Sequence, residues 1–208
     1  LSDELRVTIV AGMFRPADRN TVDSKEYNRV YNTALITGGG VHKGYDKIHT
    51  YDAFNYRESD TVRAGGELAT FLHAGVTVGV ATCFDIRFPE QFQALAKRGA
   101  KVIVVPTSWA DGPGKVEQWR ILTAARALDA GVFIAAADQA RPDFEAKAGE
   151  PSGPTGAGHS VVVDPFGTRL AEAGYGQETL VVEIDPADAD EARKQLPLEA
   201  IRQHSAIR

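Results

Sequence analysis

Three side chains that could cooperate in breaking an amide bond stand at separate points of the sequence: Lys47, Glu58 and Cys83. Cys83 follows an apolar run at residues 75–82 and precedes residues 84–90, where a helix is expected to begin. A thiol on such a strand-to-helix turn is exposed and strained, and nearby helix N–H groups favour the thiolate. Amide hydrolysis by a thiol also needs a base, an oxyanion donor and an acid for the departing ammonia. Lysine and glutamate meet these needs, so the set predicts a nucleophilic site.

Each of these residues has a simpler interpretation when it is taken alone. A free cysteine is among the most buried residue types and is usually inert. Lys47 could be an exposed strand lysine and Glu58 a loop carboxylate, since both types are mostly found at the surface. The combination favours the catalytic interpretation. Asp85 and Arg87 flank the cysteine, and we expect them to form an ion pair that fixes the turn.

The surrounding pattern predicts a layered α/β domain that would position these residues. Apolar, β-branched runs typical of strands alternate with two helical patterns, at residues 89–98 and 116–130. Gly99 and Gly131 are expected to end these helices. The strand runs occupy residues 6–12, 30–37, 75–82, 101–106, 132–137, 160–163 and 179–184. Pairs at 7–37 and 160–184 resemble hairpins, so a mixed sheet is expected, with a long surface loop at 141–158.

Composition excludes several classes of function. The 208 residues carry a formal net charge of -5 and no long basic run, so nucleic acid is not an expected partner. No run of about 20 apolar residues that could span a membrane is present, and no signal peptide is expected. The single cysteine cannot form an internal disulfide, which favours a cytoplasmic location. The five histidines show no ligand spacing, so no metal is predicted.

Several separated motifs resemble the nitrilase superfamily of carbon–nitrogen hydrolases, in its amidase branch. They follow the family order through nearly the whole chain, which makes the resemblance specific. The motifs are residues 47–49 (KIH), 83–90 (CFDIRFPE), 102–109 (VIVVPTSW), 117–119 (EQW), 126–128 (RAL), 158–160 (GHS) and 163–167 (VDPFG).

This resemblance implies a four-layer αββα sandwich and a Glu–Lys–Cys triad that works without a cofactor. It assigns Cys83 as nucleophile, Lys47 as oxyanion stabiliser and Glu58 as an additional glutamate that orients the lysine and the substrate. The backbone N–H of Phe84 would complete the oxyanion hole, and Trp109 is expected either to contact substrate or to pack in the core. At least a homodimer is implied.

One part of the family pattern has no match in this sequence, namely the general-base glutamate of the first strand and loop. Residues 1–5 resemble the last turn of a helix and the chain does not begin with methionine. We therefore expect residues 1–208 to be a single carbon–nitrogen hydrolase domain that lacks its N-terminal segment. Glu4 lies in a different motif and is not assigned the role of the base.

The resulting hypothesis is hydrolysis of a small aliphatic or ω-amide through a thioester to a carboxylic acid and ammonia. Phe84 and Asp85 after the nucleophile are similar to amidase members, whereas true nitrilases have tryptophan and glutamate there. Two alternatives stay open. One is an N-carbamoyl amidohydrolase, and the other is a catalytically impaired binding protein with the same fold.

Overall fold

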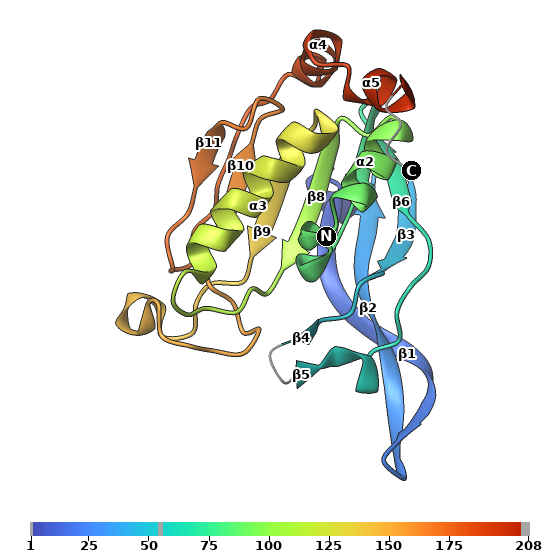
Figure 1. Cartoon of the computed structure of the whole chain (residues 1–208), viewed down its shortest axis with the longest axis vertical. Helices are drawn as coiled ribbons and strands as arrows, with labels where there is room; N and C mark the ends of the chain where they lie inside the picture. The colour runs from blue at the N-terminus through green and yellow to red at the C-terminus, as the bar shows by residue number, and fades with distance from the viewer. Residues whose placement is uncertain (1, 54–55, 205–208) are drawn as a thin grey trace.

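The computed structural model describes residues 2–53 and 56–204, and the side chains up to Arg202. Two packed β-sheets and a layer of helices form the body of the molecule (Figure 1). The larger sheet has six strands in the order β11-β10-β9-β8-β7-β6. They are β6 Ala69–His73, β7 Val76–Val80, β8 Val102–Thr107, β9 Phe133–Asp138, β10 Val161–Val163 and β11 Arg169–Glu172. Strands β7, β8 and β9 run parallel and the others antiparallel, so this sheet is mixed, as predicted.

A second sheet of three antiparallel strands contacts the large sheet through β1 and β8. Its strands are β1 Ile9–Val22, β2 Lys25–Gly38 and β3 Val41–Asp46. The hairpin β1–β2 extends well beyond the large sheet (Figure 1). The sequence placed the first strand at residues 6–12, but β1 is longer because its polar second half pairs with β2 as far as Val22. Two short strands, β4 Asp52–Ala53 and β5 Tyr56–Arg57, form a separate ribbon.

Helices α2 Pro89–Lys97 and α3 Lys115–Ala130 pack together over the large sheet. Gly99 follows α2 and Gly131 ends α3, both with the positive φ that was expected of them. The remaining helical segments are α1 Ser2–Leu5, α4 Ala187–Gln195, α5 Leu198–His204, and the 3-10 segments η1 Glu58–Asp60, η2 Cys83–Arg87 and η3 Phe144–Lys147. The helices and two sheets agree with the expected αββα class.

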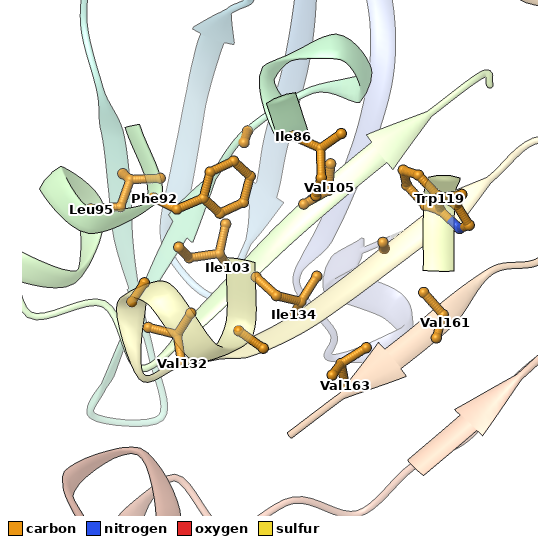
Figure 2. Packing of buried hydrophobic residues seen from close by; sticks show 14 of the residues in the cluster. Ile86, Phe92, Leu95, Ile103, Val105, Trp119, Val132, Ile134, Val161 and Val163 are labelled. Carbon is orange, nitrogen blue, oxygen red and sulfur yellow. The ribbon is translucent and has the colours of Figure 1, made fainter. Parts of the chain in front are cut away.

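The main core fills the space between helices α2 and α3 and the large sheet (Figure 2). Figure 2 shows Phe92 and Leu95 from α2 beside Ile103 from β8. All three side chains are fully buried. A second cluster, which includes Ile36, Tyr45 and Val80, packs the two sheets together. These clusters hold rigid the strand ends on which the candidate site is built.

The prediction of a strand at residues 179–184 is wrong: in the described structure this segment is extended but is not part of a sheet. The run is short, apolar and β-branched, and that composition produced the prediction. The segment lacks a strand neighbour in the described sheets, and Val181 is 89% exposed. The strand that pairs with β10 is β11 instead. The loop at residues 141–158 is mostly at the surface, as expected, and contains η3.

Candidate active site

Cys83 lies at the sharp turn between β7 and η2. Its backbone has φ of +47°, in the left-handed region that a side chain with a Cβ rarely adopts. Such a conformation costs on the order of 1–3 kcal/mol and tends to occur at functional sites. The turn is held by the Asp85 carboxylate, which accepts a hydrogen bond from Thr82 N–H at 2.8 Å. The expected strained turn is therefore present, although a 3-10 segment separates Cys83 from the start of α2.

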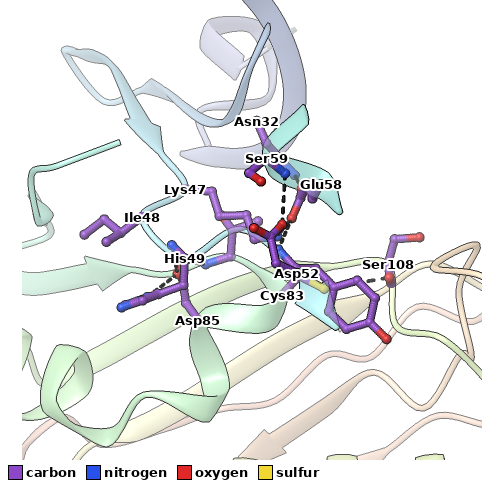
Figure 3. A network of polar contacts seen from close by, with 12 residues as sticks. Asn32, Lys47, Ile48, His49, Asp52, Glu58, Ser59, Cys83, Asp85 and Ser108 are labelled. Carbon is purple, nitrogen blue, oxygen red and sulfur yellow. Dashed lines mark hydrogen bonds and ion pairs between the residues drawn. The ribbon is translucent and has the colours of Figure 1, made fainter. Parts of the chain in front are cut away.

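Lys47 and Glu58 form a buried ion pair beside this turn (Figure 3). The Lys47 Nζ and Glu58 Oε2 atoms are 2.5 Å apart, and the two residues are only 2% and 8% exposed. Tyr51 N–H and the Asn32 side-chain amide also donate to the Glu58 carboxylate. These contacts hold the lysine in place, because separating the partners of a buried ion pair would leave a buried charge without compensation. Lys47 is the residue just after β3, one position beyond the strand on which it was expected.

Asp85 joins the lysine segment to the cysteine turn. It is fully buried and accepts hydrogen bonds from Tyr45 Oη at 2.6 Å and from the backbone N–H of His49 at 3.0 Å. Since it also accepts from Thr82, one carboxylate ties Lys47 and Cys83 into a common frame. The His49 ring lies 2.9 Å from the same carboxylate (Figure 3).

The predicted ion pair between Asp85 and Arg87 is wrong. The partners of Asp85 come from residues 45–49, which the fold brings to it from far along the chain. The Arg87 guanidinium points to other groups and donates to Gln118 Oε1 at 2.9 Å. The spacing of Asp85 and Arg87 therefore predicted an ion pair between them, but in the tertiary structure each residue has other partners.

The thiol of Cys83 lies among protein atoms, and its Sγ is 3.7 Å from the carbonyl oxygen of Ser108. Burial raises the pKa of the thiol to about 11, although the positive charge of Lys47 acts in the opposite direction. The expectation that the turn would favour a thiolate at rest is therefore wrong. At neutral pH the group is a thiol, and a base must remove its proton before it attacks.

Phe84 and Trp109 occupy different environments near the nucleophile. Phe84 is partly exposed, and its ring centre lies 5.0 Å from that of Tyr51 in an edge-to-face arrangement. Its backbone N–H finds no acceptor among the described residues, as is usual at the start of a helical segment. Trp109 is 5% exposed and packs against Trp119 in the main core, and its indole N–H donates to the Lys115 carbonyl. Its burial supports the core-packing interpretation.

Asp138, at the end of β9, is an additional buried residue that sequence reasoning did not identify. Its carboxylate accepts from Trp109 N–H at 2.8 Å and Ala157 N–H at 3.2 Å, so it anchors the loop that begins at Ser108. Burial raises the pKa of this carboxyl to about 7, against the effect of its backbone donors. Its position as the last residue of a buried parallel strand was the available signal. Asn32, which donates to the Glu58 carboxylate, was also missed.

Two general features of the described residues bear on function. Within residues 2–53 and 56–204, no helix is both long and apolar enough to cross a membrane. The same described residues contain no cluster of three His, Cys, Asp or Glu side chains that could hold a metal ion.

Comparison with known proteins assigns the chain to a family. The carbon–nitrogen hydrolase family model matches residues 1–194. A protein named "Hydrolase Rv0480c" from Mycobacterium tuberculosis is 43% identical over 202 residues, which cover 94% of this chain and 69% of the relative. "Deaminated glutathione amidase" from Escherichia coli O157:H7 is 37% identical over 172 residues, 82% of this chain and 61% of the relative.

A solved structure supports the same assignment. The crystal structure of Nit3 from Saccharomyces cerevisiae, a nitrilase-superfamily member, has a TM-score of 0.76 and 28% identity. The match covers 97% of this chain and 68% of that one. The chain belongs to the carbon–nitrogen hydrolase family, in the amidase-like branch of the nitrilase superfamily. It is an amidase-type hydrolase, and the sequence-based recognition is confirmed.

Proposed function

We propose that the protein hydrolyses the C–N bond of a small aliphatic or ω-amide through a thioester on Cys83. The observation that carries this proposal is the buried Lys47–Glu58 pair beside a cysteine on a strained turn. A name such as deaminated glutathione amidase, given to a relative, favours an amide over a nitrile.

In the first proposed step, the Cys83 sulfur attacks the amide carbon after a base has removed the thiol proton. The resulting oxyanion would accept hydrogen bonds from Lys47 and from the N–H of Phe84. Donors fixed in this way stabilise the transition state because they need no reorganisation when the charge develops. Glu58 would hold the lysine in place, since its Oε2 atom lies 2.5 Å from the Nζ atom.

The base is proposed to be a glutamate other than those in the described part of the chain. No carboxylate in the described part of the chain hydrogen-bonds to the Cys83 thiol, and Glu58 is already engaged by Lys47. With the pKa of the thiol near 11, attack without a base would be slow at neutral pH. The same base would return the proton to the departing ammonia and activate the water that cleaves the thioester.

Ammonia release tests this proposal most simply. Full-length protein is expected to release ammonia from members of a panel of short amides. Cys83→Ala should lower kcat by roughly 10⁴-fold or more, because a nucleophile acts as a unit with its partners. Equal release by the variant and the parent, or none from any amide by the parent, would contradict the proposal. Carbon dioxide appearing with the ammonia would instead identify an N-carbamoyl amidohydrolase.

We also propose that the chain forms one cytoplasmic domain that associates at least as a homodimer. An apolar groove of about 700 Å³ near the ends of α2 and α3 supports association. Leu128, Phe166 and Leu196 line it, and each is about half exposed. Exposed apolar surface of this kind is typical of protein interfaces. The unpaired cysteine supports a reducing compartment.

A further inference from the structure

A buried ion pair, Asp111–Arg141, joins two loops beside the candidate site. The Asp111 Oδ2 atom lies 3.2 Å from Arg141 Nε, and the two side chains are 0% and 5% exposed. Asp111 lies in the loop after β8, and Arg141 begins the loop at residues 141–158. Separating these partners would leave a buried charge without compensation. The pair therefore fixes the two loops relative to each other, although neither residue takes part in the proposed chemistry.

The Asp111 carboxylate also holds backbone groups of both loops. It accepts hydrogen bonds from the N–H of Gly112 at 2.7 Å and from the N–H of Gly149 at 2.9 Å. The backbone N–H of Arg141 donates in turn to the Tyr175 carbonyl at 2.9 Å. Hydrogen bonds to a charged group are stronger than those between neutral groups, so the junction of the two loops is well anchored.

More hydrogen bonds extend this attachment to Ser108. The N–H of Gly156 donates to the Trp109 carbonyl at 3.1 Å, and the Ser108 hydroxyl donates to the Pro154 carbonyl at 2.8 Å. Gly156 and Pro154 belong to the loop at 141–158. That loop is exposed along most of its length, yet it holds the residue that follows β8.

Ser108 connects the two loops to the nucleophile. Its carbonyl oxygen lies 3.7 Å from Cys83 Sγ, and the thiol donates to it in a weak hydrogen bond (Figure 3). The contact directs the sulfur and keeps water from one side of it. Burial is the largest cause of the raised pKa of this thiol, and the charges of Lys47, Glu58 and Asp138 also act on it. The position of the Ser108 carbonyl therefore affects both the direction and the protonation of the thiol.

We propose that Asp111 and Arg141 are positioning residues that hold the Ser108 carbonyl against the Cys83 thiol. This inference rests on the proposed function and assigns two residues that act on its nucleophile from a distance. A sulfur held in one direction meets the amide carbon in a reactive geometry more often, which lowers the barrier to attack. The dry contact also keeps the thiol protonated until a base removes its proton.

Alkylation of Cys83 in the full-length protein, followed by mass spectrometry of its peptide, tests the inference without requiring turnover. Iodoacetamide is neutral and reacts with the thiolate, so its rates between about pH 7 and pH 11 give the apparent pKa of the thiol. Arg141→Met should lower this apparent pKa by roughly one unit, because the detached loop would admit water to the sulfur. Arg141→Lys keeps a positive charge beside Asp111 and should return the value at least halfway to that of the parent.

Ser108→Ala is a milder variant that removes only the hydroxyl anchor to Pro154 and keeps the carbonyl. It should lower the apparent pKa as well, by a smaller amount, and it decides the question if Arg141→Met does not fold. The matched control is Arg29→Met, which breaks an ion pair with Asp18 on the hairpin β1–β2 and should leave the apparent pKa unchanged. Urea unfolding would establish that each variant is folded during the assay.

An apparent pKa that is unchanged in Ser108→Ala and in folded Arg141→Met would overturn the inference and leave the proposed function intact. A shift of the same size in Arg29→Met would also overturn it, because the effect would then not depend on the two loops. Lack of alkylation of Cys83 in the parent throughout this pH range would instead contradict the proposed nucleophile.

Discussion

Individual side chains of this site are tuned chiefly by burial. The pKa of Cys83 is raised to about 11 and that of Asp138 to about 7, and in both cases loss of water is the largest cause. The positive charge of Lys47 acts against the rise in the pKa of Cys83. The resting site is thus a neutral thiol next to an internally neutralised ion pair. Such a site becomes nucleophilic only when a base takes the proton.

Asp138 gives a prediction about stability and pH. Its pKa is about 7 when folded and near 3.9 when unfolded, so between these values the folded state binds more protons. The free energy of unfolding should therefore fall as pH rises from 4 to 7, by up to about 4 kcal/mol from this group. Asp138→Asn cannot titrate and should lose this part of the pH dependence.

Urea unfolding of both proteins at several pH values would measure this difference. Gln139→Ala, at the exposed next position, removes no titratable group, so this control should keep the parent's slope. Parallel pH profiles for the parent and Asp138→Asn would contradict the account of a buried carboxyl with a raised pKa.

At the level of elements, the site depends on how three strand ends are joined. Lys47 follows β3, Cys83 follows β7, and Ser108 follows β8. Asp85 connects the first two of these segments through Tyr45, His49 and Thr82. A connection through one carboxylate makes the relative position of lysine and thiol sensitive to a single residue.

Asp85→Asn should therefore damage both stability and catalysis. An amide offers one acceptor oxygen where the carboxylate has two, and its NH₂ group would face backbone donors. We expect a loss of roughly 3 kcal/mol in the free energy of unfolding. We also expect kcat to fall by roughly 100-fold with little change in KM, because misplacement by about 1 Å is costly. Asp164→Asn, which changes a carboxylate in the turn between β10 and β11, serves as the control. Equal behaviour of the two variants would refute the role of Asp85.

The sequence predicts the helices and most strands of this fold because their patterns are local. Residues 89–98 and 116–130 show helical spacing that ends at glycine, and both helices form. The run at 179–184 has the apolar, β-branched composition of a strand, but a strand also needs a neighbour, which no local pattern contains. For the same reason Asp85 was given Arg87 as a partner, whereas Tyr45 and His49 reach it through the tertiary fold.

The residues of the candidate site also divide into those that the sequence predicts and those that need the tertiary structure. Cys83, Lys47 and Glu58 were identified by residue type and by the family motifs, and the structure brings them together. The pKa of the thiol could not be predicted in the correct direction, because burial depends on what surrounds the turn. Asp138 needed its contact with the Trp109 backbone N–H before a role could be assigned.

For the whole molecule, the apolar groove predicts a second copy as its partner. The protein at low micromolar concentration should have at least twice the 22.4 kDa mass of one chain. Leu128→Glu should shift it toward the monomer, because the new charge would be buried on association. Phe14→Glu, on the exposed face of β1, introduces the same charge but should not shift the protein toward the monomer. Mass photometry distinguishes these outcomes, and a monomeric parent would contradict the proposed association.

The central claim, that Cys83 forms a thioester with the acyl part of an amide, can be tested by trapping that intermediate. Full-length protein would be mixed with a substrate amide, quenched in acid during turnover, digested and analysed by mass spectrometry. The account predicts an added mass equal to the acyl group on the peptide that contains Cys83, and no such mass in Cys83→Ala. Steady ammonia release with an unmodified Cys83 peptide, matched by ammonia release from Cys83→Ala, would contradict it.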